Sequence, residues 1–376
     1  MVIFLFTFLF LYGGIHLYAF IKADSIFHFP AGIKIVIIIL LIILIFAPLL
    51  VRIAESRHLE ELALVFAYAG YVWMAFIFSF FCLGIVFDLL RLILKVIPHG
   101  GGAVSLKNMA FGLTVFLSVV FVIYGFIDAQ RIRIKKLEIY TEHQLPNNGK
   151  IRIVQISDVH IGLVIKEKRL QLVLDRVKEA DPDILVSTGD LLDGELNNVL
   201  PLAGLFRQIK PKYGKYAVVG NHEYYAGIEK SLEFTRAAGF EVLIDEARQV
   251  AGINIIGLDD PTGRRIGIVR NNPDRQKKLP EVKGGGFILL LKHQPFVNAE
   301  DVFNLQLSGH THGGQLIPFR LITHFIFPED YGFYKIAEQK TLYVSRGTGT
   351  WGPPVRIFAP PEITVIDLIP LVRDER

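Results

Sequence analysis

Two histidines one residue apart, His310 and His312, have the type and spacing of metal ligands. They lie in the stretch Gly309-His310-Thr311-His312-Gly313-Gly314-Gln315, directly after an apolar run. Imidazole is the commonest metal ligand of proteins near neutral pH because it offers an uncharged nitrogen lone pair. Neighbouring glycines let the backbone turn sharply, so both rings can converge on a small space. Taken alone, the pattern is better explained as a polar loop, and the metal interpretation depends on motifs upstream.

Four polar motifs upstream each come directly after a hydrophobic run. Hydrophobic runs of about 4–8 residues that end in turn residues predict β-strands. In layered α/β folds, the loops that follow neighbouring strands meet at one edge, where ligands bind. Periodic apolar residues predict intervening helices at 167–180, 196–209 and 228–238. We therefore expect a single site to collect Asp158-Val159-His160 after 151–157, Gly189-Asp190 after 183–188, Gly220-Asn221-His222-Glu223 after 215–219, and Lys292-His293 after 287–291.

The candidate ligands in these motifs are oxygen or nitrogen donors, with no thiolate among them. Such a set suits Mn, Fe, Zn or Co and exceeds what one tetrahedral ion binds, so two ions are implied. Two close cations repel unless anions bridge them, and we expect the Asp190 carboxylate and one hydroxide in that position. Water acidified by the ions is a nucleophile for in-line phosphoryl displacement, which indicates hydrolysis of a phosphomonoester, phosphodiester or pyrophosphate. The candidate metal ligands are Asp158, His160, Asp190, Asn221, His293, His310 and His312.

In this order the motifs resemble those of the calcineurin-like metallophosphoesterase superfamily. The matching pattern is Asp-x-His, Gly-Asp-x-x-Asp, Gly-Asn-His-Glu, His-x-Pro and Gly-His-Thr-His, over roughly residues 151–366. The form Gly-His-Thr-His-Gly-Gly-Gln, together with Ser345-Arg346-Gly347, further resembles a membrane-associated bacterial branch. The resemblance implies an α/β fold in which a two-sheet β-sandwich is flanked by helices.

The resemblance also implies a role for each position of the site. His222 is expected beside the bound phosphate, where an imidazolium oriented by Asp193 would protonate the leaving oxygen. A structural histidine is the alternative for His222. One metal is expected on Asp158, His160, Asp190 and His312, and the other on Asp190, Asn221, His293 and His310.

One position departs from the pattern of the protein phosphatases in this superfamily. They carry an arginine right after the second aspartate of the Gly-Asp motif, where it grips the phosphoryl group, whereas this chain has Gly194. The difference argues against a phosphoprotein phosphatase. Arg346 is a substitute clamp in one interpretation and a surface or structural residue of the strand end in the other, which we favour.

The elements that precede the predicted site are apolar. The 376-residue chain is 52% hydrophobic and 20% charged, with its charged residues concentrated after about residue 130. Charge-free runs of about 20 residues are long enough to cross a bilayer as helices. We expect an all-α four-helix transmembrane region in residues 1–130, a basic juxtamembrane linker with the first strand in 131–150, and the metallophosphoesterase domain in 151–376. The expected spans are 2–21, 35–51, 62–87 and 109–127.

Charge counts address the sidedness of the membrane region and exclude one class of partner. Lys and Arg near the span ends number six on the side of the catalytic domain and five on the other, and the basic group from Arg131 to Lys136 favours a cytoplasmic domain.

No basic stripe interleaved with aromatic residues appears, so we expect no nucleic-acid binding. The only cysteine, Cys82, excludes an intrachain disulfide. Five histidines are expected to be interfacial or surface groups: His16, His28, His58, His99 and His143.

Two hypotheses for function remain. The first is a membrane-anchored phosphoesterase, with a lipid-linked substrate as one option because the domain is held at the bilayer. The segment 316–327, which contains His324, is then a membrane-contacting or acyl-lining loop, or alternatively packs against the sheet. The second is a non-catalytic membrane sensor or scaffold that binds metal or nucleotide. Intact Asp190, Asn221 and His222 argue against the second hypothesis.

Overall fold

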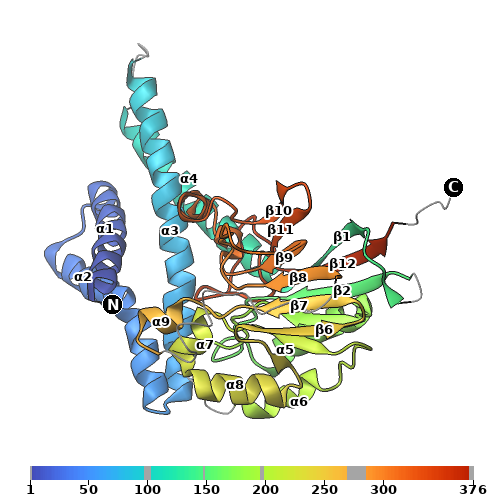
Figure 1. Cartoon of the computed structure of the whole chain (residues 1–376). Helices are drawn as coiled ribbons and strands as arrows, with labels where there is room; N and C mark the ends of the chain where they lie inside the picture. The colour runs from blue at the N-terminus through green and yellow to red at the C-terminus, as the bar shows by residue number, and fades with distance from the viewer. Residues whose placement is uncertain (1, 97–102, 147–148, 195–198, 269–284, 372–376) are drawn as a thin grey trace. The chain divides into compact units, whose positions relative to one another are not determined.

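The structure, a computed structural model, describes residues 2–96, 103–146, 149–194, 199–268 and 285–371. The chain forms two compact units. The first comprises the chain up to Asp128 together with Gly352–Ile357, and the second comprises Ala129–Trp351 and the chain from Phe358 onward. The first unit is helical, and the second contains all the described β-strands (Figure 1).

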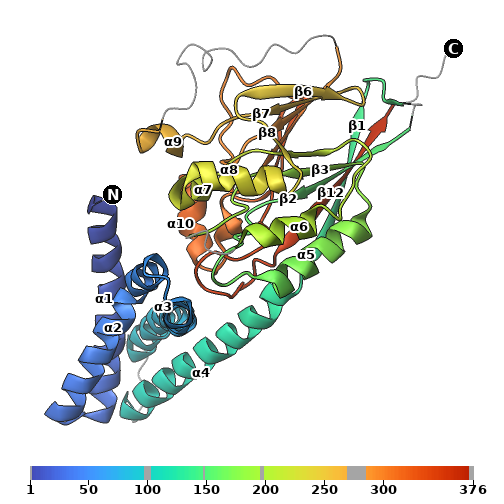
Figure 2. The same ribbon diagram turned by 90° about the horizontal axis from the view of Figure 1, so that it is seen from below.

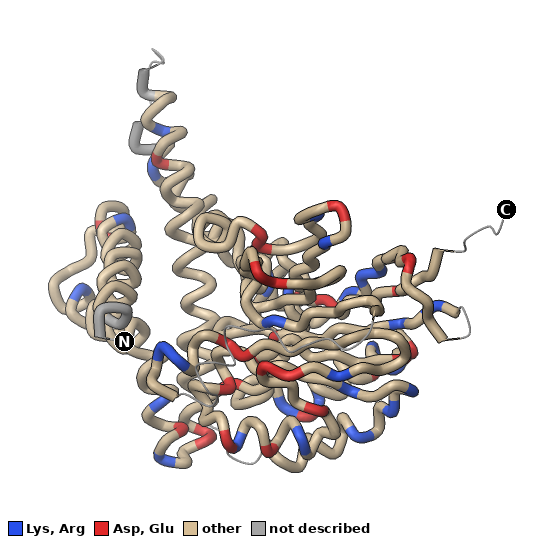
Figure 3. The backbone as a smooth tube through the Cα atoms, in the orientation of Figure 1, with Lys and Arg blue, Asp and Glu red and all other residues tan. Residues whose placement is uncertain are grey.

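Four helices of the N-terminal region are long and apolar enough to cross a membrane. Their sequences contain few charged residues, as Figure 3 shows for the corresponding tube segments. A helix needs about 20 predominantly apolar residues to span the hydrocarbon core, which each of them provides. These four long apolar helices were expected, and they are α1 (Val2–Phe27), α2 (Ala31–Ser56), α3 (Glu60–Val96) and α4 (Ala103–Gln130).

Polar side chains inside the helical unit pair with one another across helices. His16 is buried, with its Nδ1 2.7 Å from the carbonyl oxygen of Tyr12 and its Nε2 2.8 Å from the indole nitrogen of Trp73. Because an indole N–H only donates, Nε2 accepts and Nδ1 carries the proton. The expectation that His16 is interfacial or at the surface is therefore wrong, whereas His28 and His58 are exposed and His99 lies outside the described residues.

Two mixed six-stranded sheets form the second unit, as expected for an α/β sandwich. The first has the order β1-β12-β2-β3-β4-β5 and the second the order β10-β11-β9-β8-β7-β6. The strands of the first sheet are β1 (Arg133–Thr141), β12 (Glu362–Pro370), β2 (Ile151–Ile156), β3 (Ile184–Ser187), β4 (Lys215–Ala217) and β5 (Glu241–Val242). Those of the second are β10 (Gly332–Ala337), β11 (Lys340–Val344), β9 (Leu305–Ser308), β8 (Phe287–Leu291), β7 (Ile253–Gly257) and β6 (Glu246–Val250).

The two faces of strand β2 supply two different cores. Ile151 and Ile153 belong to the buried cluster shared by strands of both sheets, which includes Leu289 and Leu307. Alternation along the strand turns Val154 and its neighbour Ile156 to the opposite face. That face packs against helices, because its cluster contains apolar residues of α5 (Glu167–Ala180), α6 (Ala203–Phe206) and α8 (Ile228–Ala237) (Figure 2).

Most elements that carry the predicted motifs lie where periodicity places them. Helix α5 has the predicted bounds, and α8 ends one residue before its predicted end. The helix predicted for 196–209 is confirmed only in part over its described residues, where the chain forms a short 3-10 turn (Leu200–Leu202) followed by the four-residue α6. Residues 195–198 lie outside the described residues.

Candidate metal centre

The loops that carry the candidate ligands follow the carboxyl ends of parallel strands. Strands β2, β3 and β4 pair in parallel in the first sheet, and β8 and β9 do so in the second. Gln155, fully buried at the end of β2, joins the two sheets there, because its amide nitrogen donates to Thr188 Oγ1 and to the carbonyl oxygen of Ser308. The two sets of strand ends are thereby fixed next to each other.

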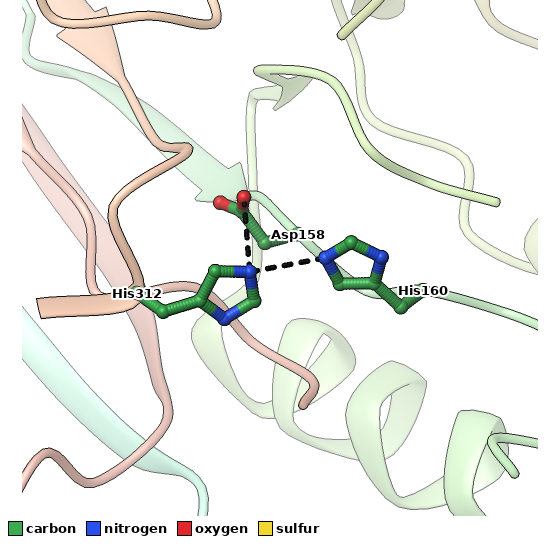
Figure 4. A group of neighbouring side chains, drawn as sticks. All are labelled: Asp158, His160 and His312. Carbon is green, nitrogen blue, oxygen red and sulfur yellow. Dashed lines mark hydrogen bonds and ion pairs between the residues drawn. The ribbon is translucent and has the colours of Figure 1, made fainter. Parts of the chain in front are cut away.

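Asp158, His160 and His312 form the first cluster of potential ligands (Figure 4). The Nε2 atoms of His160 and His312 lie 3.0 Å apart, and Asp158 Oδ1 lies 3.5 Å from His312 Nε2. All three residues are buried. Burial lowers the pKa of His160 to about 4, so its imidazole is neutral at physiological pH and has a lone pair to offer.

Asp190, Asn221, His293 and His310 form the second cluster. His293 Nδ1 lies 2.8 Å from the carbonyl oxygen of Thr188, to which it donates, so Nε2 faces the other three residues. Nε2 is 3.1 Å from Asp190 Oδ2, 3.1 Å from Asn221 Oδ1 and 3.1 Å from His310 Nδ1. Burial lowers the pKa of His310 to about 3, which keeps that ring neutral. Four electron-rich atoms thus converge around a space that favours a cation.

One oxygen of Asp190 faces both clusters. Asp190 Oδ2 lies 3.1 Å from His293 Nε2 and 4.0 Å from His160 Nε2. Burial alone would raise the pKa of Asp190, but the neighbouring His293 and His222 outweigh it and hold the pKa well below its usual range. A buried carboxylate that stays ionised between two clusters of potential ligands has the position needed to bridge two cations.

The backbone at the site is held in an uncommon conformation. Five candidate ligands have a positive φ: 51° at Asp158, 55° at His160, 51° at Asp190, 73° at His310 and 52° at His312. This left-handed backbone conformation costs free energy for residues other than glycine. It persists where the surrounding structure enforces it, commonly at functional sites. The sheets and their buried hydrogen bonds provide that constraint here.

Two glycines leave room for the ligands to approach closely. A Cβ atom at Gly220 would overlap Asp190 Oδ1, and one at Gly309 would overlap Ser157 Oγ and Asp158 Oδ2. Gly309 lies directly before His310, whose backbone N–H donates to Asp158 Oδ1 at 3.0 Å. The close approach of these loops is what brings residues from distant strands into one cluster.

His222 and Asp193 form a pair at the edge of the first cluster. His222 Nδ1 lies 2.7 Å from Asp193 Oδ1, and the His222 and His160 ring centroids are 4.6 Å apart. Burial lowers the pKa of His222, but the carboxylates of Asp190 and Asp193 outweigh it and raise the pKa to about 9. His222 is therefore an imidazolium at neutral pH, with its Nδ1 proton directed to Asp193.

Glu223 organises the site without belonging to either cluster. Its buried carboxylate accepts the backbone N–H groups of Asp190 at 2.9 Å, Leu191 at 2.7 Å, Leu192 at 3.1 Å and Gly220 at 2.7 Å. It thereby ties the loop after β3 to the start of α7 (Asn221–Ala226). We did not assign this residue a role from the sequence, although a glutamate three residues after a helix N-cap is the pattern of a capping box.

Two aromatic rings flank His222, and we did not predict either from the sequence. Tyr225 and Trp351 have ring centroids 5.6 Å and 5.8 Å from that of His222, and both are about half exposed. Gln315, the last residue of the histidine motif, clamps the Trp351 backbone: its Nε2 donates to the carbonyl oxygen at 2.8 Å, and its Oε1 accepts the N–H at 3.0 Å. The repeated glycines before Gln315 are the only sequence signal for this tight turn.

Arg346, weighed as a phosphate clamp, lies in structural contacts. Its guanidinium stacks 4.0 Å from the centroid of the Tyr331 ring, and its Nε is 4.0 Å from Glu362 Oε2. These contacts support the interpretation of Arg346 as a structural residue.

A two-sheet α/β sandwich with clustered Asp, His and Asn side chains at its strand ends is the arrangement that the sequence motifs predict for a metallophosphoesterase. Comparison with known proteins agrees. The family model described as calcineurin-like phosphoesterase matches residues 151–314. An uncharacterized metallophosphoesterase of Aquifex aeolicus is 39% identical over 257 residues, which are 67% of this chain and 98% of that protein.

The chain belongs to the calcineurin-like metallophosphoesterase family. Two further relatives extend the match beyond the β-sandwich. A transmembrane protein with metallophosphoesterase domain of Danio rerio is 31% identical and covers 79% of this chain and 74% of its own length. An uncharacterized metallophosphoesterase of Campylobacter jejuni is 31% identical and covers 77% of this chain and 78% of its own length. Together with the four apolar helices, the name of the Danio rerio relative indicates a membrane protein.

Proposed function

We propose that the protein is a membrane-anchored phosphoesterase that hydrolyses its substrate with the help of two divalent metal ions. The observation that carries this proposal is Asp190 Oδ2, which lies within 4.0 Å of a ligand nitrogen in each of the two clusters. The donors are oxygen and neutral imidazole nitrogen, which suit Mn, Fe, Zn or Co. Asp158, His160 and His312 would hold one ion, and Asn221, His293 and His310 the other, with Asp190 shared between them.

When bound, the two cations supply Lewis acidity that polarises the phosphoryl oxygens and acidifies water. The residues of the chain fix where this acidity acts. The Asp190 backbone is held by Glu223, and His293 is oriented by its bond to the Thr188 carbonyl oxygen, as ligating histidines usually are by their second nitrogen.

His222 is the group we assign to proton transfer. Asp193 binds Nδ1, so the opposite ring nitrogen, Nε2, carries the proton available to the leaving oxygen. A raised pKa keeps that proton on the ring at neutral pH, where a general acid must be protonated. The negative charges of Asp190 and Asp193 raise this pKa. We therefore assign His222 as the general acid and Asp193 as the residue that orients its ring.

His222 also has the position of a metal ligand, because His160, Asp193 and His222 form a third group of potential donors. Its Nδ1 is already 2.7 Å from Asp193 Oδ1, and this carboxylate stabilises the protonated ring that a general acid needs. We therefore favour the acid over the ligand. Metal analysis of His222→Ala separates the two, because loss of the acid leaves the metal content unchanged and loss of a ligand lowers it.

The substrate is a phosphate ester, and we leave monoester, diester and pyrophosphate open. Anchoring at a bilayer favours a lipid-linked substrate. We also propose that the β-sandwich unit faces the cytoplasm, on the basis of the basic residues that follow α4. Cleavage by protease added to sealed inside-out vesicles would support this orientation, and protection there would contradict it.

Turnover of two chromogenic esters tests the proposed activity. Full-length protein loaded with Mn, Fe, Zn or Co is assayed on p-nitrophenyl phosphate and bis-p-nitrophenyl phosphate, beside Asp190→Ala and His222→Ala. A matched control is Asp175→Ala, which removes an exposed carboxylate of α5 that belongs to neither ligand cluster. We expect turnover in the wild type and the control, and loss in both site variants. No turnover of either ester or of a lipid pyrophosphate with any metal would contradict the proposal and favour a binding role.

A further inference from the structure

Helix α10 (Phe319–Ile326) has its apolar side chains on the outside. Phe325 is 90% exposed and Leu321 is 74% exposed, and Phe319, Ile322 and Ile326 are also exposed. Leu321 and Phe325 are four residues apart and lie on one stripe of the helix. A helix on the surface of a protein in water normally buries this stripe and exposes its polar one. The exposed stripe of α10 therefore fits an apolar surrounding.

The side of α10 that contacts the rest of the unit is polar. A helix displaced from a hydrophobic core would instead have its apolar side directed inward. Arg320 Nε lies 2.6 Å from Asp330 Oδ2, and Asp330 is fully buried. Thr323, in the middle of the helix, is buried, and the Arg320 guanidinium stacks 4.4 Å from the Tyr331 ring centroid. These contacts attach α10 by its polar side and hold its apolar side outward.

The same helix packs directly against the candidate metal centre. A Cβ atom at Gly314, two residues after the ligand His312, would overlap the backbone of Arg320, so loop and helix are in close contact. Just past the helix, the Phe327 ring centroid lies 5.1 Å from that of His310 and 5.0 Å from that of Phe296. An apolar surface thus continues from α10 to a candidate ligand.

The covalent chain limits how far this unit can lie from a bilayer. Helix α4 ends at Gln130 and β1 begins at Arg133, so two residues join them, and the three Cα–Cα steps between these ends span at most about 11 Å. Arg131, Arg133, Lys135 and Lys136 follow α4 in the sequence and suit anionic lipid head groups. A unit that begins this close to the end of an apolar helix has a lipid surface within reach.

We propose that α10 lies in the membrane–water interface, with Leu321, Ile322 and Phe325 inserted among the lipid acyl chains. Amphipathic helices in this position bury their apolar face about 5–10 Å into the boundary between head groups and acyl chains. This has one consequence for the activity, which rests on the proposed function: the metal centre, whose histidine loop packs against α10, would lie next to the layer that holds the phosphate groups of amphiphilic esters.

Fluorescence quenching tests the insertion without any use of turnover. In the full-length chain, Cys82→Ala removes the native cysteine, and Phe325→Cys provides one site for an environment-sensitive nitrobenzoxadiazole label. The control is Gln249→Cys, in the exposed part of β6. Both proteins are placed in nanodiscs of phosphatidylcholine and phosphatidylglycerol, with and without brominated acyl chains, and titrated with aqueous iodide.

We expect the label at position 325 to lose most of its fluorescence in brominated nanodiscs and to resist iodide, and the label at position 249 to do the reverse. A label at 325 that iodide quenches as strongly as the one at 249, with no effect of bromine, would overturn the proposal. Shielding from both quenchers would also overturn it, in favour of a protein partner or a second copy. A second label at Leu321→Cys guards against a local disturbance, because it must give the same pattern. Insertion without phosphoesterase turnover would leave this inference intact and reject the proposed function alone.

Discussion

The Nε2 atoms of His160 and His312 lie 3.0 Å apart in the interior of the β-sandwich unit. Two ring nitrogens this close need a proton or a cation between them, and Asp158 adds a negative charge 3.5 Å from His312 Nε2. His293 Nε2 also needs a proton or a cation beside it, because it faces Asp190, Asn221 and His310. The pKa of His293 is raised well above its usual value, since Asp190 and Asp158 outweigh the effect of burial. A field that holds a proton this firmly would hold a metal cation in its place.

The pH dependence of turnover reports on His222. A general acid must be protonated, so activity should fall as the pH rises through the pKa of His222, which is raised to about 9. Cations bound beside Asp190 oppose the field that raises this pKa, so the alkaline limb should lie at or below pH 9. The measurement is the pH profile of kcat/KM for wild type and His222→Asn.

We expect His222→Asn to be slower by about 10²–10⁴-fold, the usual contribution of acid–base catalysis, and to lack the alkaline limb. Asp193→Asn should shift the limb to lower pH, since one of the carboxylates that raise the pKa is then gone. An alkaline limb that is unchanged in His222→Asn would show that another group donates the proton.

Removing Glu223 should both destabilise the fold and loosen the metal centre. Glu223→Ala leaves four buried backbone N–H groups without their acceptor, and each unsatisfied buried donor costs about 1–3 kcal/mol. Burial raises the pKa of Glu223 to about 7. Loss of this side chain also removes the acceptor of the Asp190 backbone N–H, so the loop that carries Asp190 is no longer held in place. Thermal unfolding and metal titration of the full-length protein measure the two effects. Glu233→Ala, at an exposed position of α8, should change neither, and equal behaviour of the two variants would refute the role of Glu223.

A single methyl group at Gly309 should disrupt the first cluster. The added Cβ would overlap Ser157 Oγ and Asp158 Oδ2, so the strand end must move and displace Asp158 from His312. Gly309→Ala should therefore lower metal affinity, measured by competition with a chelator. Gly204→Ala adds the same methyl group in α6, where no heavy atom lies within 4 Å, and should be neutral or slightly stabilising. Full metal affinity in Gly309→Ala would mean that the loop relaxes without moving Asp158.

The aromatic rings beside His222 should contact the leaving group, because the acid that protonates the leaving oxygen must lie next to it. Trp351→Ala and Tyr225→Ala remove exposed rings 5.8 Å and 5.6 Å from His222 between centroids. We expect a severalfold rise in KM for aromatic leaving groups, with a smaller effect for alkyl leaving groups. Phe358→Ala, which removes a similarly exposed ring elsewhere, is the control. A uniform fall in kcat across both ester types would assign the rings a structural role instead.

Local sequence patterns predicted the elements that carry the site better than the contacts between them. Helix α5 and strand β8 have their predicted bounds because periodic apolar residues report local structure directly. The partners of Gln155 and Glu223 depend on how strands from distant parts of the chain pair, and spacing does not encode that. His16 was misplaced for the same reason, since its partner Trp73 lies on another helix.

Helix α10 shows a second limit of sequence patterns. The apolar residues from Phe319 to Ile326 are compatible with packing against the sheet and with exposure, and only the contacts of Arg320 and Thr323 decide which side faces inward. Strands β10, β11 and β12 were also not predicted individually. The resemblance to a family supplied the fold for that part of the chain, whereas periodicity did not.

The metal content of Asp190→Ala tests the central claim most directly. Full-length wild type, Asp190→Ala and Asp175→Ala are purified, loaded with the same divalent metal, freed of excess metal and analysed by inductively coupled plasma mass spectrometry. If Asp190 is shared by two ions, wild type and Asp175→Ala should each retain two metal ions per chain, and Asp190→Ala should retain almost none. Two ions in Asp190→Ala, or a single ion in the wild type, would contradict the shared-carboxylate centre.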